Sequence, residues 1–89
     1  MSYTKYNFDK ETLEAILTLK KALDFHNSFR LTPLSWTEFQ NLTVGGSVLK
    51  AHMTLGNWFL KNKEHIKEAN NGKELTYWDL GKEIFDGNN

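Results

Sequence analysis

The feature that most restricts the fold is a helix-start pattern around Ser35. Ser35 and Glu38 have the spacing of a capping box, in which each side chain accepts a hydrogen bond from the other residue's backbone N–H. Leu34 and Phe39 stand at the two positions of a hydrophobic staple, which packs across the same helix end. A helix is therefore expected to begin at Trp36.

Two adjacent glycines keep this helix short. Gly45 and Gly46 can adopt the positive φ angles that end helices. Ser47 can cap a new helix directly afterwards, and apolar residues recur beyond it at helical spacing. The sequence thus predicts two helices joined by a tight glycine turn, the second covering residues 47–63.

A longer helix is predicted before this pair. Asp9 is a good N-cap, and apolar residues recur at helical spacing as far as Leu23, so we expect a helix over 10–27. The chain then reaches Thr32-Pro33, and the residue before a proline disfavours the α conformation. Residues 29–31 are therefore expected to be extended and could form a short edge strand.

The segment from 65 to 78 has two locally consistent interpretations. In the first, residues 65–69 and 73–78 are strands joined by Asn71-Gly72, the pair best suited to a two-residue type I′ hairpin turn. In the second, the third helix continues to about Ala69, and Gly72 is the C′ residue that ends it.

The second interpretation also predicts a last helix. Thr76 and Asp79 have capping-box spacing, and Leu75 and Leu80 have the spacing of a staple. This helix would run through Phe85. Both interpretations of the C-terminal third stay open at the level of sequence.

At 89 residues the chain can bury one core, so we expect a single domain over residues 1–89 with flexible ends at 1–8 and 87–89. The expected fold is mainly α, with a three-helix core and a C-terminal β-hairpin wing. The alternative is an all-α four-helix domain. The chain has no cysteine, no apolar leader and no apolar run of membrane-spanning length, which favours a soluble, cytoplasmic protein.

Acidic residues are absent between Phe39 and Lys63, although acids and bases balance over the whole chain. At 100° per residue, the helix over 47–63 has an apolar face and a polar stripe opposite to it. The face comprises Val48, Ala51, Leu55, Trp58 and Phe59, and the stripe comprises Lys50, Thr54, Asn57 and Lys61. A positive stripe with short hydrogen-bonding side chains suits a polyanion such as nucleic acid.

The predicted order of elements resembles that of the winged helix-turn-helix family. The resemblance implies that the third helix enters the major groove and that the wing contacts the DNA backbone. Together with the absence of acidic residues between Phe39 and Lys63, the resemblance implies these DNA-binding residues: Ser47, Lys50, Thr54, Asn57, Lys61 and Lys63 on the helix, and Lys67 and Lys73 on the wing. The expected function is sequence-specific binding of duplex DNA, as a small regulator or accessory factor of the kind that phages and plasmids encode.

A further apolar row on the same helix exceeds what a small core needs. Leu49, Met53 and Leu60 form this row, and we expect it to contact a neighbouring element or a second subunit. Because a neutral chain binds DNA weakly as a single copy, a homodimer is expected. The row also supports a rival hypothesis, a small protein–protein adaptor or inhibitor with no nucleic-acid binding.

No pattern of catalytic or metal-binding residues stands out. His26, His52 and His65 lack repeated i, i+4 spacing and nearby carboxylate clusters, and His52 beside the apolar face fits a packed, hydrogen-bonded histidine. We therefore expect no enzymatic activity, metal, cofactor or small-molecule substrate. Three tryptophans are expected in the core: Trp36, Trp58 and Trp78.

Overall fold

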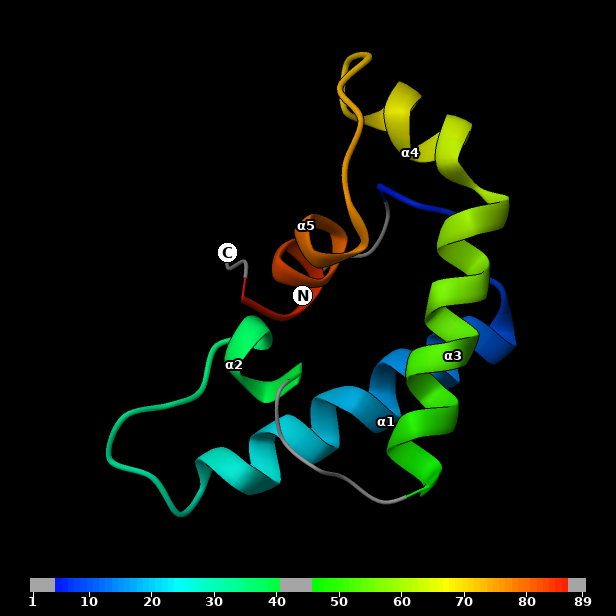
Figure 1. Cartoon of the computed structure of the whole chain (residues 1–89). Helices are drawn as coiled ribbons and strands as arrows, with labels where there is room; N and C mark the ends of the chain where they lie inside the picture. The colour runs from blue at the N-terminus through cyan, green and yellow to red at the C-terminus, as the bar shows by residue number, and fades with distance from the viewer. Residues whose placement is uncertain (1–4, 41–45, 87–89) are drawn as a thin grey trace.

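Helices account for all the regular structure in the computed structural model, which describes residues 5–40 and 46–86 (Figure 1). The elements are α1 (Lys10–Asn27), α2 (Trp36–Gln40), α3 (Gly46–Lys61), α4 (Lys63–Ala69), α5 (Tyr77–Gly81) and a π-helical turn, η1 (Lys82–Asp86). The described residues contain no strand, so the predicted β-hairpin wing is wrong. The all-helical alternative fits.

Helix α1 has the predicted bounds, and α3 packs across it (Figure 1). The Asp9 side chain caps the helix by accepting a hydrogen bond from the backbone N–H of Thr12, at 2.9 Å. Ile16, Leu19 and Leu23 are buried along the face that meets the core. The cap and the apolar spacing were therefore sufficient to define this helix.

Residues 29–31 are not the edge strand that the sequence suggested. The loop is held instead by the Asn27 side chain, which accepts a hydrogen bond from the backbone N–H of Leu34 at 2.7 Å and donates one to its carbonyl at 3.4 Å. These two bonds give the end of the loop the pairing that a neighbouring strand would otherwise supply.

The capping box at the start of α2 is confirmed. The backbone N–H of Glu38 donates to the Ser35 hydroxyl at 3.2 Å, and the backbone N–H of Ser35 donates to the Glu38 carboxylate at 3.0 Å. The helix begins at Trp36 as predicted, and Phe39 is buried one turn later.

The predicted glycine turn falls largely on residues 41–45, which lie outside the described residues. Helix α3 begins at Gly46, so Ser47 lies in its first turn and does not precede it as a cap. The helix ends at Lys61 and not at Lys63. At the break, the Asn62 side chain donates to the carbonyl of Trp58 at 2.8 Å, which satisfies one of the last carbonyl groups of α3.

Asn71 and Gly72 end helix α4 where a hairpin turn was expected. The backbone N–H of Gly72 bonds the carbonyl of Lys67 at 2.8 Å, and that of Asn71 bonds the carbonyl of Glu68 at 3.3 Å. This is a Schellman motif in which Asn71, at φ 59°, is the C′ residue and Gly72, at φ 87°, follows it. A type I′ turn needs the same positive φ angles, so the local sequence permits both structures.

The predicted last helix is confirmed as α5 and η1 together. The Thr76 hydroxyl accepts a hydrogen bond from the backbone N–H of Asp79, and the Asp79 carboxylate accepts one from that of Thr76, both at 3.1 Å. Leu80 is buried and Leu75 packs against the core. The extended segment before Thr76 returns the chain from α4 toward α2 and α3 (Figure 1).

Trp36 lies at the centre of the C-terminal half of the core. Its ring is fully buried and stacks on Phe85 of η1, with centroids 4.4 Å apart and planes 16° apart. Its indole edge occupies the space in which Gly81 would carry a side chain, because a Cβ there would lie 2.0 Å from the Trp36 Nε1 atom. Trp58 is also buried, but Trp78 is half exposed, so the prediction of three core tryptophans is wrong for Trp78.

Residues near the N-terminus bind the C-terminal elements. The Lys5 ammonium lies 2.6 Å from the Glu83 carboxylate and donates to the Asn70 side chain at 2.6 Å. The buried Tyr6 hydroxyl donates to Glu83 and accepts from the Asn70 amide at 3.0 Å. Burial is the main reason that the pKa of Tyr6 is raised to about 12, and Glu83 adds to the shift.

We predict that Gly81→Ala destabilises the fold, because its Cβ would overlap the fully buried Trp36 ring. Overpacking of this kind costs about 1–3 kcal/mol, more than the gain of about 1 kcal/mol from replacing a helical glycine. Urea denaturation should show a lower free energy of unfolding.

Gly56→Ala is the matched control for this change. A Cβ at Gly56, in the middle of α3, meets nothing within 4 Å in its own chain, so at a protein concentration that keeps the chain monomeric this variant should gain about 1 kcal/mol of stability. Equal effects of the two substitutions would contradict the role of Gly81.

Candidate functional site

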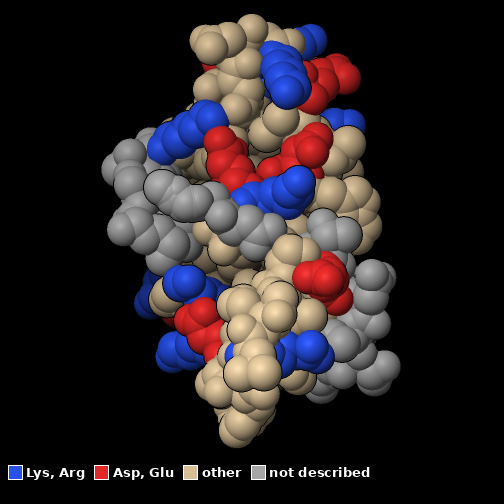
Figure 2. All heavy atoms as spheres, turned by 90° about the vertical axis from the view of Figure 1, so that its left-hand side faces the viewer, with Lys and Arg blue, Asp and Glu red and all other residues tan. Residues whose placement is uncertain are grey.

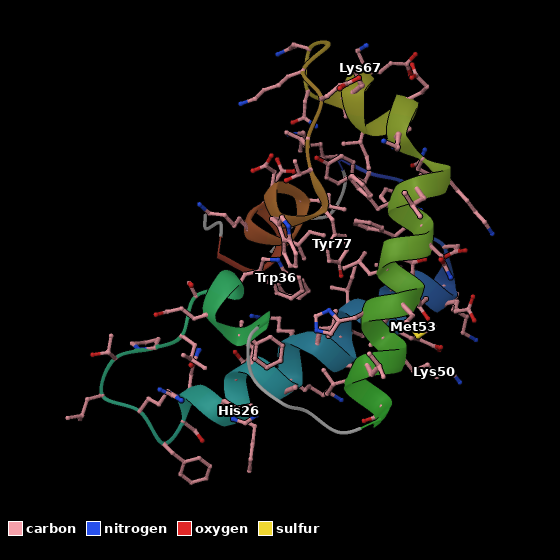
Figure 3. The ribbon with its side chains drawn as sticks, viewed as in Figure 1. His26, Trp36, Lys50, Met53, Lys67 and Tyr77 are labelled. Atoms are coloured by element: carbon pink, nitrogen blue, oxygen red, sulfur yellow. The ribbon has the colours of Figure 1, made fainter. Side chains whose placement is uncertain are left out.

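The polar stripe predicted on α3 lies at the surface as expected. Ser47, Lys50, Asn57 and Lys61 are exposed and Thr54 is half-buried. The Thr54 hydroxyl donates to the carbonyl of Lys50 one turn earlier, at 3.0 Å. Figure 3 shows Lys50 projecting from α3 away from Trp36 and Tyr77.

Acidic residues from α1 lie alongside this stripe. Glu11 and Glu14 line a shallow groove together with Lys50, and Asp9 and Glu11 line the next groove together with Lys61. Three acidic residues therefore lie beside the stripe in the folded chain, although the sequence segment that forms the stripe contains none. The pKa of Asp9 is lowered, first by its hydrogen bonds with Thr12 and in smaller part by the charge of Lys61.

The remaining lysines of the predicted DNA surface belong to α4 and the segment after it. Lys63 is the first residue of α4 and not the last of α3, and Lys73 is exposed beyond the Schellman motif. Lys67 lies 3.9 Å from the Glu74 carboxylate, so its charge is partly neutralised. Figure 3 shows Lys67 at the far end of the molecule from Lys50, so these two do not share one small patch.

Charges of both signs are mixed elsewhere too. Figure 2 shows lysine and arginine side chains interspersed with aspartate and glutamate on the face that it presents. The formal net charge of the chain is zero. Neither observation indicates the broad positive surface on which binding to the DNA backbone depends.

The apolar row on α3 is exposed, which is uncommon for large side chains on one face of a helix. Leu49, Met53 and Leu60 are 58, 61 and 65% exposed, so no described element covers them. With Gly56 they are spaced four, three and four residues apart, the spacing of a coiled-coil seam. We call these four residues the α3 seam.

A groove of about 340 Å³ adjoins the α3 seam. Its lining residues are Met53, Gly56, Asn57, Phe59, Leu60 and Tyr77. Because Gly56 has no side chain, the helix surface is hollow there, and Tyr77 of α5 forms the opposite wall. The sequence did not single out Tyr77, because its place beside α3 depends on a contact between segments far apart in the chain.

Tyr77 is held against α3 by His52. The His52 Nδ1 atom lies 3.3 Å from the Tyr77 hydroxyl oxygen, as expected for a packed, hydrogen-bonded histidine. Burial lowers the pKa of His52 and raises that of Tyr77 to about 12. Both side chains are therefore uncharged near neutral pH, and the groove has an uncharged wall.

A second group of exposed apolar residues lies at the end of α1 and in the following loop. Phe25 and Phe29 make an edge contact, with ring centroids 5.2 Å apart, and Leu31 is fully exposed. This group has no seam spacing and belongs in part to a loop. The α3 seam, in contrast, lies entirely on one helix.

Other classes of site find no support among residues 5–40 and 46–86. No group of three histidine, aspartate or glutamate side chains in these ranges could hold a metal ion. In the same ranges, no helix has the length and apolar character needed to cross a membrane. Comparisons with protein-family models, curated proteins and solved structures found no match to the chain.

We predict that the α1 acids suppress binding of polyanions to the lysine stripe. The Glu11→Gln, Glu14→Gln double variant should elute from a heparin column at a salt concentration about 50 mM higher than the unmodified chain. Glu64→Gln with Glu68→Gln makes the same change in net charge on α4 and is the control. A shift as large in the control would show that only net charge matters.

The packing of His52 predicts a dependence of stability on pH. Because its pKa is below the usual 6.5 in the folded state, the unfolded chain binds the proton more readily. Its contribution is complete above pH 6.5 and is lost as pH falls through the folded pKa. Urea denaturation at several pH values should show a smaller loss in His52→Gln, and identical slopes would contradict this.

Proposed function

We propose that this chain is a small protein-association module that binds through the α3 seam and the groove beside it. The observation that carries this proposal is the exposure of three large apolar side chains in coiled-coil spacing on one helix. Surface leucines occur singly in many proteins, but an aligned row beside an apolar groove is typical of a binding face.

The energetics fit an association of moderate strength. Burying the exposed part of Leu49, Met53 and Leu60 contributes about 3–5 kcal/mol, whereas the loss of translational and rotational freedom opposes association by at least about 4 kcal/mol. The row therefore needs the additional contacts of the groove. We infer reversible binding, as expected for an adaptor or inhibitor.

The electrostatics favour this proposal over duplex DNA binding. The stripe on α3 offers two lysines, and Asp9, Glu11 and Glu14 lie beside it. Binding to the DNA backbone depends on several phosphate contacts, so a surface with this balance would bind weakly. DNA binding stays the rival hypothesis. Strong retention of the unmodified chain on the heparin column would favour it.

Site-specific photo-cross-linking in the organism that encodes the chain tests the proposal. A photoreactive phenylalanine analogue replaces Met53 in one variant and Lys50 in the control, both exposed on α3. We expect covalent protein adducts from position 53, of any mass above the monomer, and few from position 50. Adding Leu60→Asp should reduce them, because it places a charge in the seam.

Two results would overturn the proposal. Equal adducts from positions 53 and 50 would indicate random collision, and the absence of adducts from position 53 would indicate that nothing binds the seam. Circular dichroism of each variant shows whether the helical fold is retained, so a failure to fold is recognised separately.

A further inference from the structure

We propose that the occupant of the α3 seam is a second copy of this chain, paired antiparallel to the first. This inference rests on the proposed function and names its partner. The whole seam lies within α3 (Gly46–Lys61), so two copies can align it along one continuous helix pair. What indicates a second copy is the arrangement of large and small residues within the seam.

The seam is complementary to itself when one helix is reversed. Leu49 and Leu60 lie equally far from the midpoint between Thr54 and Leu55, and so do Met53 and Gly56. In an antiparallel pair, each Leu49 therefore faces the partner's Leu60, and each Met53 faces the partner's Gly56. A two-fold axis makes both contacts twice, as in an isologous dimer.

The shapes of the facing residues also match. Met53 protrudes from the helix, whereas Gly56 leaves a hollow beside Phe59 and Tyr77. Methionine is flexible and fills irregular spaces well, and packing a large residue against a small one is how helices interdigitate. The groove beside the seam is then the space that receives the partner's Met53.

Side-chain size favours the antiparallel arrangement over the parallel one. A parallel pair would set Met53 against the partner's Met53 and Gly56 against the partner's Gly56, which crowds the first contact and leaves a void at the second. The zero net charge of the chain adds no general repulsion between copies.

Disulfide trapping tests both the pairing and its direction. The chain has no cysteine, so Leu49→Cys and Leu60→Cys each introduce a single thiol. In the proposed dimer, like positions lie about 17 Å apart along the axis, too far for a disulfide, whereas unlike positions face each other. A mixture of the two variants, one labelled with ¹⁵N, should form a mixed disulfide under a glutathione redox buffer, and neither variant should cross-link alone.

Leu49→Cys mixed with Lys50→Cys is the control, because these two positions lie about 15 Å apart along the axis in the proposed dimer. It should cross-link at least about tenfold less than the seam pair. Equal cross-linking in the control, none in the seam mixture, or disulfides within a single seam variant would each overturn the antiparallel pairing.

An exchange of Met53 and Gly56 gives a second test that uses no covalent bond. Gly56→Met alone sets methionine against methionine, and Met53→Gly alone leaves a void, so each should weaken dimerisation by about tenfold or more. The double variant restores both large-to-small contacts and should recover most of the affinity. Sedimentation equilibrium measures this, and additive losses in the double variant would contradict the proposed register.

The failure of this inference can be distinguished from the failure of the proposed function. Photo-cross-links from position 53 only to other proteins, together with no seam disulfide, would retain the association module and exclude self-pairing. An absence of every adduct from position 53 would remove both.

Discussion

The burial of Trp36 is the contact on which the rest of the structure depends. Its ring connects α2 to η1 through Phe85 and to α5 through the space above Gly81. It also contacts His52 of α3, with ring centroids 5.3 Å apart. A single aromatic side chain thereby fixes the C-terminal elements against α3, and this places Tyr77 at the edge of the α3 seam.

The same packing determines which face of α3 is left for function. The inner face is covered by α1 and by the C-terminal elements, so its apolar residues form the core. The outer seam is left exposed by the described elements, although Leu49, Met53 and Leu60 are as apolar as the core residues. Leaving such a row in water forgoes the stabilisation of burial, which is consistent with a surface that is covered by a partner.

Charge shows where inference along the sequence was insufficient. The interval from Phe39 to Lys63 contains no acid, which suggested a positive surface, but the electric field depends on distance in space. Helix α1 crosses α3 and brings Glu11 and Glu14 beside Lys50. No periodicity within α3 could indicate these neighbours, because they come from a helix more than thirty residues earlier in the chain.

The sequence by itself determined the starts of α1, α2 and α5, because each depends on hydrogen bonds between residues three apart: Asp9 with Thr12, Ser35 with Glu38, and Thr76 with Asp79. It also determined which residues of α3 are buried, and it indicated that Leu49, Met53 and Leu60 exceed the apolar residues that a small core needs. Only the tertiary structure decided between hairpin and helix at Asn71-Gly72, since both allow positive φ. Ile66 of α4 is buried by contacts with distant segments. The local sequence around Asn71-Gly72 cannot specify such contacts, whereas the folded chain gains free energy from burying this side chain.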